Sequence, residues 1–115
     1  MPRLKKQVFG KLISCVSLRT GEQREGRRSH FIDKPGLIKV YVSENQFPGK
    51  VFVSYFPYED TDQQPYINTS CGEMEWLEDG CILTTAHTRY TFIYGVFDLT
   101  EEQRDHLFNI SSRHH

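Results

Sequence analysis

Bulky apolar side chains recur with period two along much of this chain, and turn residues interrupt them at short intervals. Residues 37–43 and 89–97 alternate in this way, and residues 51–56 read VFVSYF, a nearly continuous apolar run. A period of two belongs to the β-strand, because successive side chains point to opposite faces of a sheet. The pattern therefore predicts a chain built mainly from strands.

The turn residues set the lengths of these strands. Pro-Gly occurs at 35–36 and again at 48–49, and Asp-Gly occurs at 79–80. Proline presets φ near −65° and glycine accepts positive φ, so such dipeptides favour tight turns. We expect about six or seven strands, with hairpins formed by 37–43 with 51–56 and by 81–85 with 89–97, and a long first strand over 7–19. The segment 66–79 fits a strand or a helix.

Faces can be assigned within one of these strands. In residues 37–43 the alternation places Ile38 and Val40 on the inner face and Lys39 and Tyr41 on the outer face. We expect the outer residues to contact solvent, because one face of an antiparallel sheet is often solvated.

One helix is predicted at the C-terminal end. Thr100 and Gln103 have the spacing of a capping box, in which each side chain bonds the backbone N–H of the other residue. Two glutamates follow Thr100 in the first turn, where the helix dipole favours negative charge. The apolar stripe that would dock on the sheet is Leu107, Phe108 and Ile110. The predicted fold class is thus mainly β (α+β), a small antiparallel barrel or sandwich with one C-terminal α-helix.

The length of 115 residues suits a single domain, 1–115. We expect residues 1–6 and 111–115 to be flexible ends, and the terminal histidine pair at 114–115 resembles a tag remnant. No apolar run reaches the roughly 20 residues of a membrane span, and no apolar segment follows the basic N-terminus as in a secretory signal. We therefore expect no membrane association.

The cysteine count bears on the compartment. The chain has three cysteines, Cys15, Cys71 and Cys81, an odd number that excludes a complete disulfide framework. Reduced thiols and a cytoplasmic location are the main expectation. A bridge between Cys71 and Cys81 is the alternative.

Charge is divided unevenly along the chain. Residues 1–50 hold 11 Lys and Arg against 4 Asp and Glu, whereas residues 51–115 hold 3 against 11. The acidic part is interleaved with aromatic residues, a combination found where protein interfaces place anchors and rims. Our main hypothesis is therefore a small non-enzymatic protein-binding module of the inhibitor, immunity or adaptor type. Its predicted contact residues are Tyr58, Glu59, Asp60, Asp62, Glu73, Glu75, Trp76 and Glu78.

An arginine-rich loop at 19–28 supports an alternative hypothesis, a nucleic-acid-binding small β-barrel. Arginine binds phosphate with a bidentate fork, and exposed aromatic side chains on such barrels stack on bases. The sequence pI of about 6.5 argues against this function, because most nucleic-acid-binding domains are strongly basic. The residues concerned are Arg19, Arg24, Arg27 and Arg28.

No motif indicates catalysis, a metal or a cofactor. Cys71, Cys81 and His87, with His30 or His106 as a fourth ligand, are spaced more widely than the close pairs of zinc sites. Cys15 lies in the middle of a predicted strand, without a helix N-terminus to lower its pKa. A small hydrolase or transferase without a recognisable motif is the third hypothesis.

Overall fold

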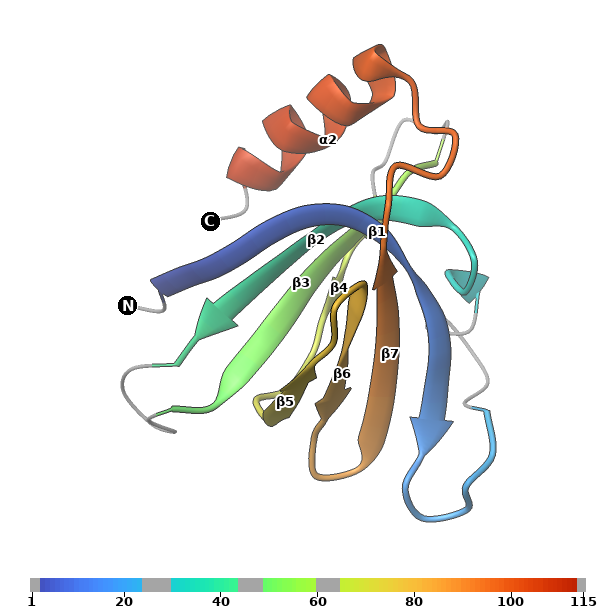
Figure 1. The fold of residues 1–115 in the computed structure, drawn as a ribbon, viewed down its shortest axis with the longest axis vertical. Coiled ribbons are helices and arrows are strands. Elements are labelled where there is room, and N and C mark those ends of the chain that lie inside the picture. The colour runs from blue at the N-terminus through green and yellow to red at the C-terminus, as the bar shows by residue number, and fades with distance from the viewer. Residues whose placement is uncertain (1–2, 24–29, 44–48, 60–64, 114–115) are drawn as a thin grey trace.

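The computed structural model describes residues 3–23, 30–43, 49–59 and 65–113 (Figure 1). Within these ranges the chain is mainly β, as predicted, with one C-terminal helix. Its elements are β1 (Arg3–Ser17), β2 (Pro35–Val42), β3 (Val51–Pro57), β4 (Ile67–Asn68), β5 (Glu73–Trp76), β6 (Gly80–Thr84), β7 (Thr88–Tyr94) and α2 (Glu101–Arg113).

The strands form one antiparallel sheet in the order β4-β3-β2-β1-β7-β6-β5. Both predicted hairpins, β2–β3 and β6–β7, are confirmed. The sheet curls until its two ends meet, where Val51 at the start of β3 and Gly72 just before β5 exchange two backbone hydrogen bonds of 2.8 and 3.0 Å. This contact makes the architecture barrel-like rather than a sandwich of separate sheets.

Strand β1 connects the two halves of the barrel. Residues 3–11 pair with β2, and residues 10–17 pair with β7, so Gly10 belongs to both ladders. A Cβ atom at Gly10 would lie 2.2 Å from the carbonyl oxygen of Ile93 and 2.7 Å from Cδ1 of Ile38. Only glycine permits this close approach of β7 to β1.

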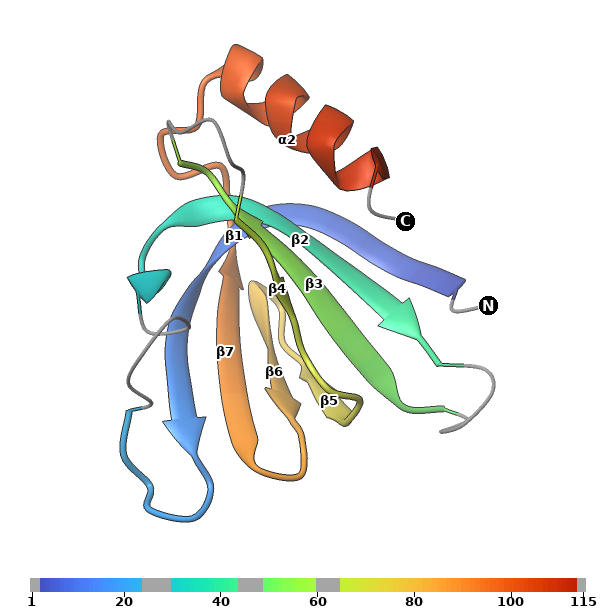
Figure 2. The same ribbon diagram turned by 180° about the vertical axis from the view of Figure 1, so that it is seen from behind.

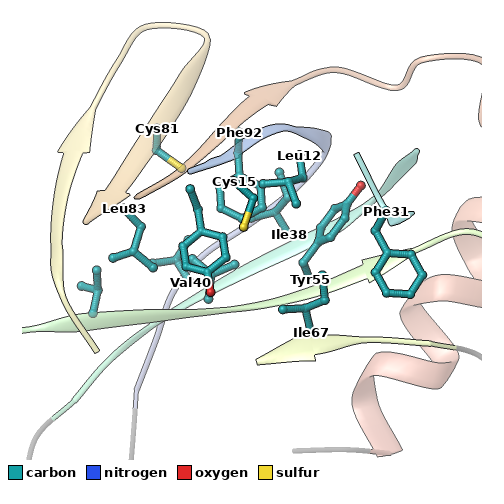
Figure 3. Packing of buried hydrophobic residues seen from close by; sticks show 13 residues of the cluster. Leu12, Cys15, Phe31, Ile38, Val40, Tyr55, Ile67, Cys81, Leu83 and Phe92 are labelled. Atoms are coloured by element: carbon teal, nitrogen blue, oxygen red, sulfur yellow. The ribbon is translucent and has the colours of Figure 1, made fainter. Parts of the chain in front are cut away.

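Side chains on the inner face fill the barrel (Figure 3). The largest fully buried members come from several strands, and Tyr55 contacts Phe92 edge to face with ring centroids 5.6 Å apart. A second, smaller cluster lies on the outer face of β2 and β3 beneath α2, and it contains Leu37, Phe56, Leu99 and Leu107. Figure 2 shows α2 lying outside the sheet over β1 and β2.

Helix α2 begins as predicted. The Thr100 hydroxyl accepts the N–H of Gln103 at 3.1 Å, and the Gln103 side chain accepts the N–H of Thr100 at 2.9 Å. Of the predicted stripe, Leu107 is buried and Ile110 is half-buried, whereas Phe108 is exposed at the rim, where its ring contacts Phe9.

Strand and helix extend further toward the two ends of the chain than the sequence predicted. Residues 3–6 belong to β1, which begins at Arg3 rather than at residue 7, because β2 extends far enough to pair with them. At the other end, α2 continues to Arg113 and buries Ser111, so residues 111–113 are helical. Residues 1–2 and 114–115 lie outside the described residues. Residues 66–79, for which the sequence fitted either a strand or a helix, contain two short strands, β4 and β5.

The outer face of β2 is not solvated as predicted. Lys39 and Tyr41 are 7% and 5% exposed, because α2 packs against β2 and the Tyr41 ring stacks on Phe52. Burial lowers the pKa of Lys39, and its Nζ lies 6.0 Å from the centre of the Tyr41 ring. A lysine side chain with little exposed surface therefore lies on a face that the sequence pattern assigned to solvent.

The close approach at Gly10 predicts the effect of one added methyl group. Gly10→Ala should lower the free energy of unfolding by about 1–3 kcal/mol, because its Cβ overlaps the Ile93 carbonyl. Chemical denaturation measures this. Gly21→Asn is the matched control: that position has φ of 74° and open space around it, so its stability should stay near the wild type. Equal stability of the two variants would contradict the constraint at Gly10.

The lowered pKa of Lys39 predicts a stabilising substitution. Lys39→Met keeps the aliphatic stem and removes the charge that burial disfavours, so it should raise the free energy of unfolding at pH 7, by less than about 1 kcal/mol because solvent screens much of that charge. The pKa of Lys39 is lower in the folded protein than in the unfolded chain. The charge of Lys39 therefore destabilises the fold by a constant amount at pH values below its folded pKa, and this effect disappears as the pH rises past its unfolded pKa. Denaturation at pH 7 and pH 10 should show the advantage of the variant shrinking with pH; an advantage that grows would refute it.

Candidate functional site

The predicted acidic-aromatic residues lie in two separate places. Tyr58 and Glu59 follow the C-terminal end of β3, where the N–H of Tyr58 donates to the Pro35 carbonyl. Glu73 begins β5, beside the opposite end of β3. Seven strand residues span roughly 20 Å, so the two groups cannot belong to one small contact patch. Asp60 and Asp62 lie outside the described residues.

The carboxylate of Glu59 already has cationic partners. Its Oε1 accepts a hydrogen bond from Lys34 Nζ at 2.5 Å and lies 3.3 Å from His30 Nε2. The hydrogen bond from Lys34 holds the pKa of Glu59 below its usual range. The neighbouring Tyr58 ring packs edge to face against His106 of α2. This end of the predicted site therefore has neutralised charge and a ring engaged with the helix.

The other end is an exposed strand at the edge of the sheet. We call residues 73–78, which comprise β5 and the two residues after it, the β5 edge. Its first carboxylate, Glu73, accepts a hydrogen bond of 2.6 Å from Lys50, which lowers the pKa of Glu73. The side chains of Glu75 and Glu78 are exposed and form no ion pair with any described residue. Unbalanced negative charge is thus concentrated in the second half of the β5 edge.

Two large apolar side chains accompany these carboxylates. Trp76 is 41% exposed and Leu77 is 42% exposed. Trp76 is opposite Cys81 of β6, so its side chain belongs to the inner face but lies at the open rim of the barrel. Lys5 of β1 places its Nζ 5.8 Å from the centre of the Trp76 ring. Exposed aromatic and aliphatic groups beside unpaired charge are typical of a binding surface.

An open hollow of about 300 Å³ lies on the outer side of the same edge. It is lined by Glu75, Ile82, Thr84 and Arg89, which the strand register places side by side across β5, β6 and β7. Glu75 is aligned with Ile82, whereas Arg89 is aligned with Thr84 in the neighbouring row. The hollow therefore offers a carboxylate and an apolar wall at one end and a guanidinium at the other.

A second feature of the rim surrounds Tyr94. Lys6 Nζ lies 4.6 Å from the centre of the Tyr94 ring, and the Tyr94 hydroxyl oxygen is buried and has no hydrogen-bond partner among the described residues. Burial raises the pKa values of both Tyr94 and the adjacent Cys81 thiol. These groups are consequently neutral at physiological pH.

The predicted nucleic-acid residues are described only in part. Arg19 is exposed in the turn that follows β1, and Arg24, Arg27 and Arg28 lie outside the described residues. The hypothesis that this loop binds nucleic acid stays a prediction.

The geometry offers little for nucleophilic chemistry. Cys15 and Cys81 are fully buried, and none of the three cysteines is bridged, so the alternative of a Cys71–Cys81 disulfide is wrong. In the part of the chain that the structure describes, no three His, Cys, Asp or Glu side chains are grouped closely enough to hold a metal ion.

Comparisons with known proteins add no assignment: no family model matches the chain, and no curated protein or solved structure matches it. Among the described residues, no helix combines the length and the apolarity required to cross a membrane.

Of the β5 edge, the sequence pattern predicted Glu73, Glu75, Trp76 and Glu78 as contact residues; it did not single out Leu77, nor Lys5, which lies outside the edge. A signal for Leu77 was present, because the Asp-Gly turn at 79–80 places the residues before it at the tip of a hairpin. Lys5 carried no such signal, since its contact with Trp76 joins residues far apart in the sequence.

Burial of the thiols predicts which cysteine reacts. With a small disulfide reagent at pH 8, the native protein should show one fast thiol, that of half-buried Cys71, and three after unfolding. Cys71→Ser should remove the fast reaction, and Cys15→Ala, the control, should retain it. Absorbance of the released thiolate counts the groups. Any fast thiol in the native Cys71→Ser protein would contradict the burial of Cys15 and Cys81.

Proposed function

We propose that this protein is a small non-enzymatic binding module, of the inhibitor, immunity or adaptor type, that docks a basic surface of a partner protein through the β5 edge. The observation that carries the proposal is the exposure of Trp76 and Leu77 beside carboxylates, Glu75 and Glu78, that form no ion pair with any described residue. Tryptophan is among the residues that contribute most binding energy at protein interfaces, where charged residues surround it at the rim.

The distribution of charge supports a smaller surface than the sequence suggested. Glu59 and Glu73 are paired with Lys34 and Lys50, so a partner would have to displace a lysine to use them. Glu75 and Glu78 are available without such displacement. Their long-range attraction would speed the encounter with a basic partner and set its orientation, while Trp76 would supply contact area.

The three free cysteines support a reducing compartment, and we propose a cytoplasmic location for this function. The arginine loop at 19–28 remains the alternative, a nucleic-acid interface. Binding of single-stranded DNA distinguishes the two proposals, because phosphate contacts weaken steeply with salt and do not depend on Glu75 or Glu78.

Reversal of the unpaired charges tests the proposal. Glu75→Lys with Glu78→Lys should slow association with the partner captured from native cells by about tenfold or more, because attraction to a basic surface becomes repulsion. Surface plasmon resonance at two salt concentrations measures the association rate. The matched control is Glu22→Lys with Asp105→Lys, two exposed carboxylates away from the β5 edge that give the same change in net charge.

The control variant should associate at nearly the wild-type rate. An unchanged rate in the Glu75/Glu78 variant, or equal slowing in both variants, would remove the β5 edge as the contact surface. Salt-sensitive binding of single-stranded DNA that survives both pairs of substitutions would favour the arginine loop instead.

A further inference from the structure

The hydrogen bonds of β5 and its flanking residues show which of its backbone groups face β6 and which face away from it. The N–H of Leu77 donates to the Gly80 carbonyl at 2.9 Å, so Leu77 points its backbone groups toward β6. Gly72 points the other way and exchanges both of its groups with Val51. Backbone direction alternates along an antiparallel strand, with the N–H and C=O of one residue on the same side. Met74 and Trp76 therefore share the direction of Gly72, away from β6.

Beyond Gly72 no described strand receives these groups. The sheet order ends at β5, and its pairing with β3 is limited to the single bridge at Val51. Within the described ranges, the N–H and C=O of Met74 and Trp76 have no backbone partner. Such a row of unpaired groups at a sheet edge is a template for one more strand.

The two faces of the edge specify different side chains in an added strand. Residues directly opposite Met74 and Trp76 would share the inner face and contact the exposed Trp76 ring. The residues between them would share the outer face with Glu75 and enter the hollow beside Ile82, at the end away from Arg89, which is aligned with Thr84. Glu75 carries a charge without an ion pair among the described residues, so the complementary side chain there is lysine or arginine.

We propose that the β5 edge binds an extended segment in which apolar and basic residues alternate, and that this segment adds to the sheet as an antiparallel strand opposite Met74 and Trp76. The inference rests on the proposed function and specifies the conformation and chemistry of the partner. We assign the antiparallel direction to the added strand because the existing Val51–Gly72 bridge beside β5 is antiparallel.

Strand addition makes a prediction that attraction between charges alone does not make. The probe is a capped nine-residue peptide that alternates lysine with valine, bound to the full chain and followed by fluorescence of Trp76, the only tryptophan. In the antiparallel register, the valines lie opposite Met74 and Trp76 and direct their N–H groups to β5, whereas the lysine N–H groups point to solvent. N-methylation of the valines should therefore raise the Kd about tenfold or more, and N-methylation of the lysines should change it less than threefold.

Equal effects of the two methylation patterns, a larger effect of lysine methylation, or no binding of the unmodified peptide would overturn strand addition. Two protein variants separate this failure from failure of the proposed function. The Glu75/Glu78 reversal could slow association with the native partner while the two methylated peptides bind equally well. That result would support the β5 edge as the binding surface but would contradict strand addition. If the reversal affects neither the partner nor the peptide relative to the Glu22/Asp105 control, both proposals fall.

Discussion

The close contact of β1 with its two neighbours at Gly10 is the constraint on which the rest of the structure depends. Strand β1, 15 residues long, pairs with both β2 and β7. At Gly10 the backbone of β7 comes so close to β1 that no side chain would fit between them. On one side of this point β1 supports β2 and the layer under α2; on the other it supports β7, β6 and β5. The curvature that results encloses the inner core and brings the two ends of the sheet together.

The manner of closure determines which surface remains available for binding. The ends of the sheet meet at Val51 and Gly72, and this one bridge satisfies only the first residue beside β5. Because only one pair of described residues joins the two ends of the sheet, the rest of β5 remains an unpaired edge. Natural proteins usually protect such edges with charged side chains. Here the protection is uneven: Lys50 neutralises Glu73 near the bridge, whereas Glu75, Trp76 and Glu78 lie beyond it. The proposed binding surface is thus a consequence of how the barrel ends.

Much of the fold could be predicted from the sequence because its signals are local. The hairpins follow from period-two alternation between turn residues, and the start of α2 follows from Thr100 and Gln103, which bond each other across one helical turn. The site was predicted less well. Glu59 and Glu73 had the same local appearance as Glu75, but each is paired with a lysine 23 to 25 residues away, a relation that alternation does not encode. Likewise, Lys39 had the pattern of a solvent-facing residue until α2 covered its face.

By itself, the sequence determined that this chain forms strands, where most of them turn, and where its helix begins, since these depend on φ preferences, side-chain alternation and hydrogen bonds within a few residues. Tertiary structure alone decided that the sheet closes as a barrel, that Lys39 is buried, and that carboxylates with no ion-pair partner in the described segments lie beside Trp76. Those outcomes require distant segments to meet. Coulomb pairing and burial depend on distance in space, which the register of β1, β2 and β3 sets and no local pattern records.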